Sequence, residues 1–265
     1  MERIEAVSTF YQERNEHERF ACNHGAVEFL TTIHYIEKYL VPGMKILEIG
    51  AGTGRYSHYF ARNGYSVDAI ELVEHNIALF QEYTQPQESV TIRQGDAIDL
   101  SEIGSDSYDI TLLLGPMYHL YTVEEQKAAL QEALRVTKPD GILFVAYCNS
   151  DMTMYQYCFG RGMIAQSIEQ NKINTQTYKL YSQPEDVFQL YRREDIDALL
   201  TDLSVERLHY VGTDMLTHLM RDCFDAMDAD TFALYMKYHL SICERPDMVG
   251  ATNHILDVLR KKYQD

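Results

Sequence analysis

The chain has 265 residues, a length that fits one α/β core with insertions better than two full domains. Hydrophobic residues make up 46% of it and charged residues 24%, a composition that excludes a disordered or low-complexity chain. Its 23 Lys and Arg residues stand against 40 Asp and Glu residues, giving a formal net charge of -17. Because so acidic a surface repels phosphate backbones, we expect no nucleic-acid partner.

The sequence also predicts the cellular compartment of the protein. Residues 1–20 contain no apolar signal core, and no run approaches the roughly 20 apolar residues of a membrane helix, so we expect a soluble, cytoplasmic protein with no membrane partner. The five cysteines are scattered without a C-x-x-C pair, which favours reduced thiols over a disulfide framework or a zinc site. No metal-ligand spacing stands out, and we expect no metal. The oligomeric state stays open.

The first half of the chain alternates predicted helices and strands. Apolar residues recur at helical spacing across residues 17–40, until Pro42 and Gly43 end the pattern. Five short apolar runs follow, with helical patterns between them and a turn signal at residues 138–141 before the last. The predicted strands are Lys45–Ile49, Val67–Leu72, Val90–Arg93, Tyr108–Leu114 and Ile142–Ala146.

The second half is less regular. Residues 150–190 are rich in Tyr, Gln and Met with weak periodicity, which is typical of an insertion. A helix is predicted at 193–203, a strand at 205–211, one or two helices within 215–243 and a last strand at 254–260. The whole pattern predicts an α/β fold, a doubly wound, mostly parallel seven-stranded sheet with helices on both faces.

The expected organisation has six parts, and its lid segments should cover the carboxyl ends of the strands, where open α/β sheets bind ligands. The parts are an N-terminal helical lid segment (1–40), the α/β core (41–149), an insertion or lid (150–192), a core helix and strand (193–212), a helical insertion or lid (213–250) and a closing edge strand (251–265).

A glycine loop lies between the first predicted strand and the next helix, with glycines at 50, 52 and 54. Such a loop lets backbone approach a ligand at a helix N-terminus, although a tight turn without a ligand is an alternative. A dinucleotide loop would carry its third small residue at position 55, which is Arg. Glu71 ends the second strand, where a carboxylate can accept hydrogen bonds from both hydroxyls of a ribose.

The stretch ILEIGAGTGRYSHYFARNGYSVDAIEL resembles the first two motifs of class I S-adenosylmethionine-dependent methyltransferases. The resemblance continues through RQGDAIDL, the segment 108–120 and EALRVTKPDGILFVAY, so that it covers residues 45–147 in order. The segment 108–120 is similar to the fourth-strand motif of the small-molecule members. Asp140 is a departure, since many members have Gly there, but a turn tolerates either residue.

The resemblance implies S-adenosyl-L-methionine as cofactor and a small-molecule methyl acceptor. It implies that Glu48 helps hold the methionine ammonium, and that Asp96 reaches the adenine amino group with Ala97 at the adenine edge. The alternatives are that Glu48 is a strand-end acid paired with Lys45 or Arg55, and that Glu71 and Asp96 are helix N-caps. The expected cofactor contacts are Tyr11, Arg19, Glu48, Gly50, Ala51, Gly52, Thr53, Gly54, Glu71, Leu72, Asp96, Ala97 and Gly115.

The acceptor side carries weaker signals. Methyl transfer from a sulfonium is an in-line displacement, so positioning is the main catalytic contribution. His119 and Tyr118 follow the fourth strand, and His119 is the candidate general base or acceptor-orienting group; a histidine hydrogen-bonded to loop backbone is the alternative. Arg19 and His24 reach the cofactor carboxylate or the acceptor, or else lie on a solvated face.

Two rival functions remain open. A nicotinamide-dependent oxidoreductase is disfavoured by Arg55 and leaves Glu48 and Asp96 without a role. A non-catalytic S-adenosylmethionine-binding regulator would keep the same cofactor residues. The sequence does not identify the acceptor, or its methylated atom.

Overall fold

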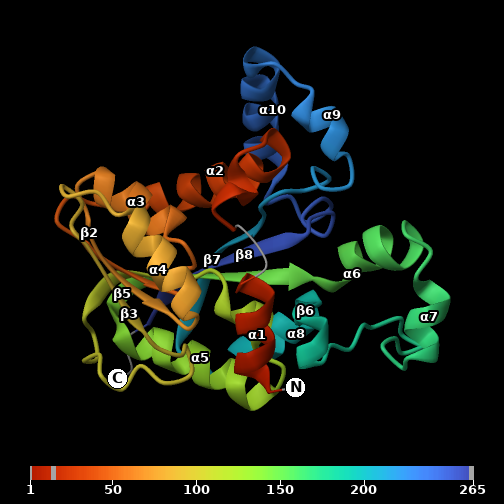
Figure 1. Cartoon of the computed structure of the whole chain (residues 1–265), viewed down its shortest axis with the longest axis horizontal. Coiled ribbons are helices and arrows are strands. Elements are labelled where there is room, and N and C mark those ends of the chain that lie inside the picture. Colours follow the sequence, from red (N-terminus) through yellow and green to blue (C-terminus); the bar gives the residue numbers. More distant parts are fainter. Residues whose placement is uncertain (1, 13–15, 263–265) are drawn as a thin grey trace.

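The computed structural model describes residues 2–12 and 16–262, which form an α/β fold around one mixed sheet (Figure 1). The sheet order is β3-β2-β1-β4-β5-β8-β7, and the short β6 pairs with β5 outside this path. The strands are β1 Lys45–Ile49, β2 Ser66–Glu71, β3 Val90–Gln94, β4 Tyr108–Leu113, β5 Thr137–Asn149, β6 Leu190–Tyr191, β7 Val205–Gly212 and β8 His254–Lys261.

Helices cover both faces of the sheet, with α2, α3 and α4 along one face and α5 along the other (Figure 1). The α-helices are α1 Arg3–Gln12, α2 Asn23–Glu37, α3 Arg55–Arg62, α4 Glu74–Tyr83, α5 Val123–Val136, α6 Ser150–Thr153, α7 Ile164–Glu169, α8 Arg193–Leu200, α9 Arg221–Asp225 and α10 Ala229–Ile242. Short 3-10 segments are η1 Glu16–Phe20, η2 Pro116–His119 and η4 Pro184–Asp186, and η3 Met154–Phe159 is a π-helix.

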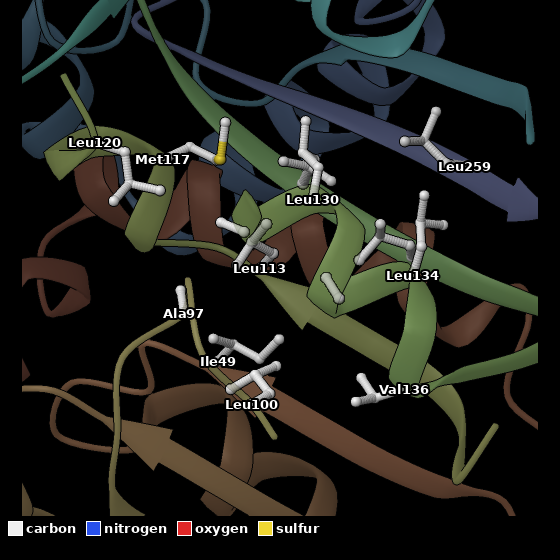
Figure 2. Close-up of a cluster of buried hydrophobic side chains, with 14 of the residues drawn as sticks. Ile49, Ala97, Leu100, Leu113, Met117, Leu120, Leu130, Leu134, Val136 and Leu259 are labelled. Atoms are coloured by element: carbon white, nitrogen blue, oxygen red, sulfur yellow. The ribbon is translucent and has the colours of Figure 1, made fainter. Parts of the chain in front are cut away.

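The predicted doubly wound sheet is confirmed. Strands β1 to β5 pair in parallel. The apolar runs that predicted β1, β2, β4 and β5 are mostly buried, as expected for strands flanked by helices, whereas the edge strand β3 is partly exposed. The two hydrophobic cores lie on opposite faces. One joins α5 to the sheet (Figure 2), and the other packs Ile36 of α2 and Phe60 of α3 against Ile46 and Phe144.

The prediction of an edge strand at the C-terminus is wrong. Strand β8 lies between β5 and β7, antiparallel to both, and β7 forms the edge. Within β8, Asp257 is fully buried and accepts hydrogen bonds from Nε and Nη2 of Arg207 at 2.7 and 2.8 Å. The ion pair with Arg207 lets the Asp257 side chain lie inside the sheet, fully shielded from solvent.

Strand β5 is longer than its apolar run predicted. It begins at Thr137, so residues 138–141, which looked like a turn, belong to the strand. Asp140 has φ 61°, and the register with β4 shifts between Tyr108 and Ile110, so the turn signal produces a local irregularity within the strand. The resulting bulge keeps the pairing on both sides of it.

The segments outside the sheet project from it in different directions. Helix α6 follows β5 directly, with η3 and α7 after it, whereas α9 and α10 project beyond α2 (Figure 1). The α6–α7 segment has a small hydrophobic cluster of its own, which includes Met154, Cys158, Ile173 and Leu180. Within the described residues, no helix combines the length and the apolar character needed to cross a bilayer.

Candidate active site

The glycine loop after β1 is shaped by backbone that only glycine adopts readily. Gly50, Gly52 and Gly54 have φ values of 75°, 55° and 85°. A Cβ at Gly50 would stand 2.6 Å from the Pro116 ring, whereas a Cβ at Gly52 would meet nothing within 4 Å. The loop is therefore packed at its first glycine and open toward a ligand at its second.

Glu71 links this loop to the end of β2. One carboxylate oxygen, Oε2, accepts a hydrogen bond from the Gly52 amide at 2.7 Å. The other, Oε1, accepts from the Val73 amide at 2.9 Å and from Asn76 Nδ2 at 3.2 Å. Burial raises the pKa of the Glu71 carboxyl, and these donors oppose the rise. The carboxylate is thus fixed beside the loop before any ligand binds.

Glu48 lies beneath the loop and is almost completely buried. Its Oε2 accepts hydrogen bonds from the Ser57 hydroxyl and, at 2.9 Å, from the Ser57 amide at the start of α3. Burial raises the pKa of this carboxyl to about 8, although the Ser57 hydrogen bonds lower it and the nearby Glu71 raises it further. A cation placed beside Glu48 would restore its charged form.

Asp96, after β3, forms an ion pair with Arg3 of α1. The Nε of Arg3 also lies 3.2 Å from Oε1 of Glu125 at the start of α5. Helix α1 therefore lies over the end of the sheet, where its residues Val7 and Tyr11 line the same pocket as Asp96. Arg3 was not predicted as a site residue, because its partners are about ninety residues or more away along the chain.

His119 has hydrogen-bond partners on both ring nitrogens. Nδ1 lies 2.8 Å from the Val187 carbonyl oxygen, so this nitrogen donates, and Nε2 accepts from the Tyr11 hydroxyl at 2.9 Å. Burial lowers the pKa of His119 to about 4, which keeps the ring neutral at pH 7. His119 is therefore hydrogen-bonded to loop backbone, as the alternative expected, and also to Tyr11 of α1.

Tyr118 presents a different environment. Its hydroxyl is buried and finds no hydrogen-bond partner in residues 2–12 or 16–262, and its ring lies 5.7 Å from that of His254. Burial raises the pKa of the phenol, so it stays protonated and can donate. Because buried hydroxyls are normally satisfied, this one indicates a position for a ligand atom.

Two cavities meet at this point of the molecule. The first contains all the predicted cofactor residues except Gly54, whose positive φ instead serves the turn into α3. The second, of about 1100 Å³, lies between η1, η3, α7 and the segment after β7. Both cavities are lined by Tyr11, Arg19, Tyr118 and His254.

Several residues at this junction were not predicted as site residues. Glu28, Asp214, His218 and His254 meet there from distant parts of the chain. His24 was predicted near the ligand, and it lines the second cavity beside His218, with ring centroids 5.2 Å apart. Long-range packing brings these side chains together, so no local spacing could have revealed them.

Comparisons with known proteins agree with the geometry. Residues 47–145 match the family described as "Methyltransferase domain". The demethylmenaquinone methyltransferase of Renibacterium salmoninarum is 36% identical over 107 residues, which is 40% of this chain and 42% of that protein. A ubiquinone biosynthesis O-methyltransferase of Caulobacter vibrioides is 32% identical over 108 residues, again 40% and 42%. The chain thus spans less than half the length of these relatives.

Solved structures show the same fold at low sequence identity. A SAM-dependent methyltransferase from Methanosarcina mazei has a TM-score of 0.59 at 16% identity, covering 87% of this chain and 98% of that one. A putative methyltransferase solved with the Trm112 activator of Haloferax volcanii also scores 0.59, at 14% identity, covering 99% and 97%. Residues 47–145 thus resemble a methyltransferase domain in sequence, and the chain shares its fold with these solved structures.

Proposed function

We propose that this protein transfers a methyl group from S-adenosyl-L-methionine to a small-molecule acceptor by in-line displacement. The observation that carries the proposal is the pairing of an open glycine loop with a fixed carboxylate, joined by the hydrogen bond from the Gly52 amide to Glu71. Glu48 and Asp96 line the same pocket. A carboxylate for the ammonium, one for the ribose and one for the adenine amino group suit this cofactor.

The residues of the pocket would bind and orient the donor. When bound, S-adenosylmethionine supplies an electrophilic methyl group on its sulfonium sulfur. Glu48 would hold the ammonium, Glu71 the ribose hydroxyls and Asp96 the adenine, beside or in place of Arg3. Helix α1 would exclude water from this end of the pocket, which strengthens each polar contact.

The second cavity is the proposed acceptor site. The unpartnered hydroxyl of Tyr118 would donate a hydrogen bond to the acceptor and align it with the methyl group. His119 would act as a positioning residue, since its Nε2 accepts from Tyr11 and its ring is neutral. The quinone-pathway names of two relatives support an acceptor that is a small molecule.

Location and partners belong to the same proposal. We expect a cytoplasmic protein, which the five unpaired cysteines support because reduced thiols persist in that compartment. The acidic composition argues against a nucleic-acid acceptor.

One observation favours a second candidate function. An S-adenosyl-L-methionine-dependent Diels-Alderase, iccD of Talaromyces variabilis, is 29% identical over 106 residues, 38% of this chain and 35% of that protein. This relative is named for a reaction other than methyl transfer. The cofactor pocket would serve both candidates, and the fate of the methyl group separates them.

The test follows the methyl group. Incubation of the purified protein with deuteromethyl-labelled S-adenosylmethionine and a metabolite extract should yield a product heavier than its precursor by one labelled methyl. The Tyr118→Phe variant should form this product more slowly while binding the cofactor normally. Cofactor binding without any labelled product across acceptor extracts would contradict the methyltransferase proposal and favour the second candidate.

A further inference from the structure

Four potential metal ligands meet where the two cavities join. Glu28 comes from α2, Asp214 and His218 from the segment after β7, and His254 from the start of β8. One side-chain nitrogen or oxygen from each lies within 4.8 Å of those of the others. This is a compact set of two imidazoles and two carboxylates inside the protein.

The spacing of these atoms fits ligands around one ion. Nδ1 of His254 lies 2.8 Å from Oδ2 of Asp214 and 3.2 Å from Oε2 of Glu28. Nε2 of His218 lies 3.5 Å from the same Asp214 oxygen. Ligand atoms at the usual metal distance of about 2.1 Å stand roughly 3.0–3.4 Å from their neighbours in octahedral or tetrahedral arrangements. Small side-chain movements would therefore complete a coordination sphere.

The cluster is held by groups around it. Asp214 is fully buried, and its Oδ1 accepts hydrogen bonds from the Thr252 hydroxyl at 2.5 Å and the Asn253 amide at 2.7 Å. These bonds turn Oδ2 toward the two imidazoles. Outer hydrogen bonds that orient a ligand in this way are a regular feature of metal sites.

The imidazole of His218 gives an independent indication. Its Nε2 is buried and has no hydrogen-bond partner among the described residues, although Oδ2 of Asp214 lies nearby. A neutral imidazole nitrogen has a lone pair suited to a metal ion. An ion between His218 and Asp214 would give this nitrogen a partner.

We propose that Glu28, Asp214, His218 and His254 bind one divalent transition-metal ion. Mixed imidazole and carboxylate donors suit Zn²⁺, Mn²⁺ or Fe²⁺ better than Mg²⁺ or Ca²⁺, which prefer oxygen alone. Oε2 of Glu28 also contacts Arg19, so the ion would use the other carboxylate oxygen or displace that arginine. The site departs from the expectation of no metal, which rested on local spacing.

The position of the metal site indicates a role in binding the methyl acceptor. This extension rests on the proposed function. His254 lines both the cofactor pocket and the acceptor cavity, and its ring lies beside Tyr118. An ion there would bind a hydroxyl oxygen of the acceptor and lower the pKa of that hydroxyl. The hydroxyl proton would pass to water, and the oxyanion would keep lone pairs with which to attack the methyl group. The acceptor class this predicts is a small molecule with a hydroxyl that can coordinate metal.

A neighbouring cluster provides a contrast. Cys22, His24 and Asp225 also lie close together, with Nδ1 of His24 at 2.7 Å from Oδ2 of Asp225. This cluster is more open, because the Asp225 side chain is 36% exposed. Any test must distinguish the two clusters.

The experiment is calorimetric titration of the chelator-treated protein with Zn²⁺, Mn²⁺ and Mg²⁺, without the cofactor. We expect one Zn²⁺ or Mn²⁺ ion per chain and at least tenfold weaker binding of Mg²⁺. His218→Ala should weaken Zn²⁺ binding at least tenfold, whereas His24→Ala and the exposed His34→Ala should leave it unchanged. Co²⁺ should give a visible absorption band in the wild type that His218→Ala alters.

The outcomes separate this proposal from the methyltransferase proposal. No stoichiometric binding of Zn²⁺ or Mn²⁺, or binding lost in His24→Ala and retained in His218→Ala, would overturn the metal site. Tighter binding of Mg²⁺ would overturn the assigned metal class. Calorimetry with S-adenosylhomocysteine reports on the cofactor pocket independently, and circular dichroism shows whether each variant folds.

Discussion

At the scale of single residues, Glu71 joins a structural role to the proposed binding role. Both carboxylate oxygens already accept hydrogen bonds from the glycine loop and from the turn into α4. A ribose would therefore meet a carboxylate whose direction is fixed, which lowers the entropic cost of binding.

We predict that Glu71→Ala weakens binding of S-adenosylhomocysteine about ten- to a hundredfold. The change removes charge-assisted hydrogen bonds worth roughly 1.5–3 kcal/mol and frees the loop. Glu74→Ala, an exposed neighbour on α4, is the matched control and should bind normally. Isothermal calorimetry measures both, and equal affinities would exclude Glu71 from the cofactor site.

Glu48 predicts a pH dependence of cofactor binding. Its pKa of about 8 leaves the free carboxyl mostly protonated at pH 7, and a bound ammonium would favour the ionised form. Binding should therefore release a proton, and affinity should rise as the pH increases from 6 to 8. Above the pKa of Glu48, this dependence should level off.

The measurement is calorimetry at pH 7 in buffers of different ionisation enthalpy, which counts the protons released. Glu48→Gln cannot ionise and should show a much smaller release. The same proton count in wild type and variant would mean that another group titrates on binding.

Residues close together in sequence were predictable, and residues joined by long-range packing were not. Glu48, Gly52, Glu71 and Asp96 follow strand ends within one stretch, so their spacing placed them correctly in one pocket. Arg3 and the four residues of the proposed metal site come from separate elements. Only the folded chain brings them together.

At the scale of elements, short apolar runs predicted the strands of the first half well, including the partly exposed edge strand β3. Strand β1 has the predicted bounds, and β2, β3 and β4 agree to within a residue at each end. The position of β8 could not be read from its own pattern, because strand order depends on partners elsewhere in the chain. The two-residue β6 is too short to produce a pattern at all.

The predicted N-terminal lid divides into two parts in the structure. Helix α2 packs into the hydrophobic core through Ile33 and Ile36, so it contributes to the sheet layer. Helix α1 buries only Ala6 and Val7, and it reaches the pocket through Arg3, Val7 and Tyr11. Of these two helices, α1 fits the predicted lid, and its role as a lid stays a prediction.

We predict that removing residues 2–12 weakens binding of S-adenosylhomocysteine several-fold but lowers the melting temperature only slightly. Helix α1 forms one wall of the pocket yet buries little apolar surface. Differential scanning fluorimetry and calorimetry measure the two effects, with the exposed Glu2→Ala variant as control. A truncated protein that unfolds would assign α1 to the core, and unchanged affinity would remove it from the site.

At the scale of the whole molecule, the chain divides its tasks between two regions. The stretch that matches the methyltransferase domain, residues 47–145, supplies the loop and the carboxylates of the cofactor pocket. The later segments supply most of the second cavity, from η3 and α7 to the residues after β7. On the proposed function, the shared fold would therefore bind the donor, and the sequence outside it would select the acceptor.

The central claim is that the pocket around Gly52 and Glu71 binds S-adenosylmethionine. Isothermal calorimetry of the unmodified protein with S-adenosylhomocysteine and with NAD tests it most directly, since both carry adenosine and only the first carries the amino-acid group that Glu48 would hold. We predict stoichiometric binding of S-adenosylhomocysteine and no measurable binding of NAD. Binding of NAD without binding of S-adenosylhomocysteine would contradict the account.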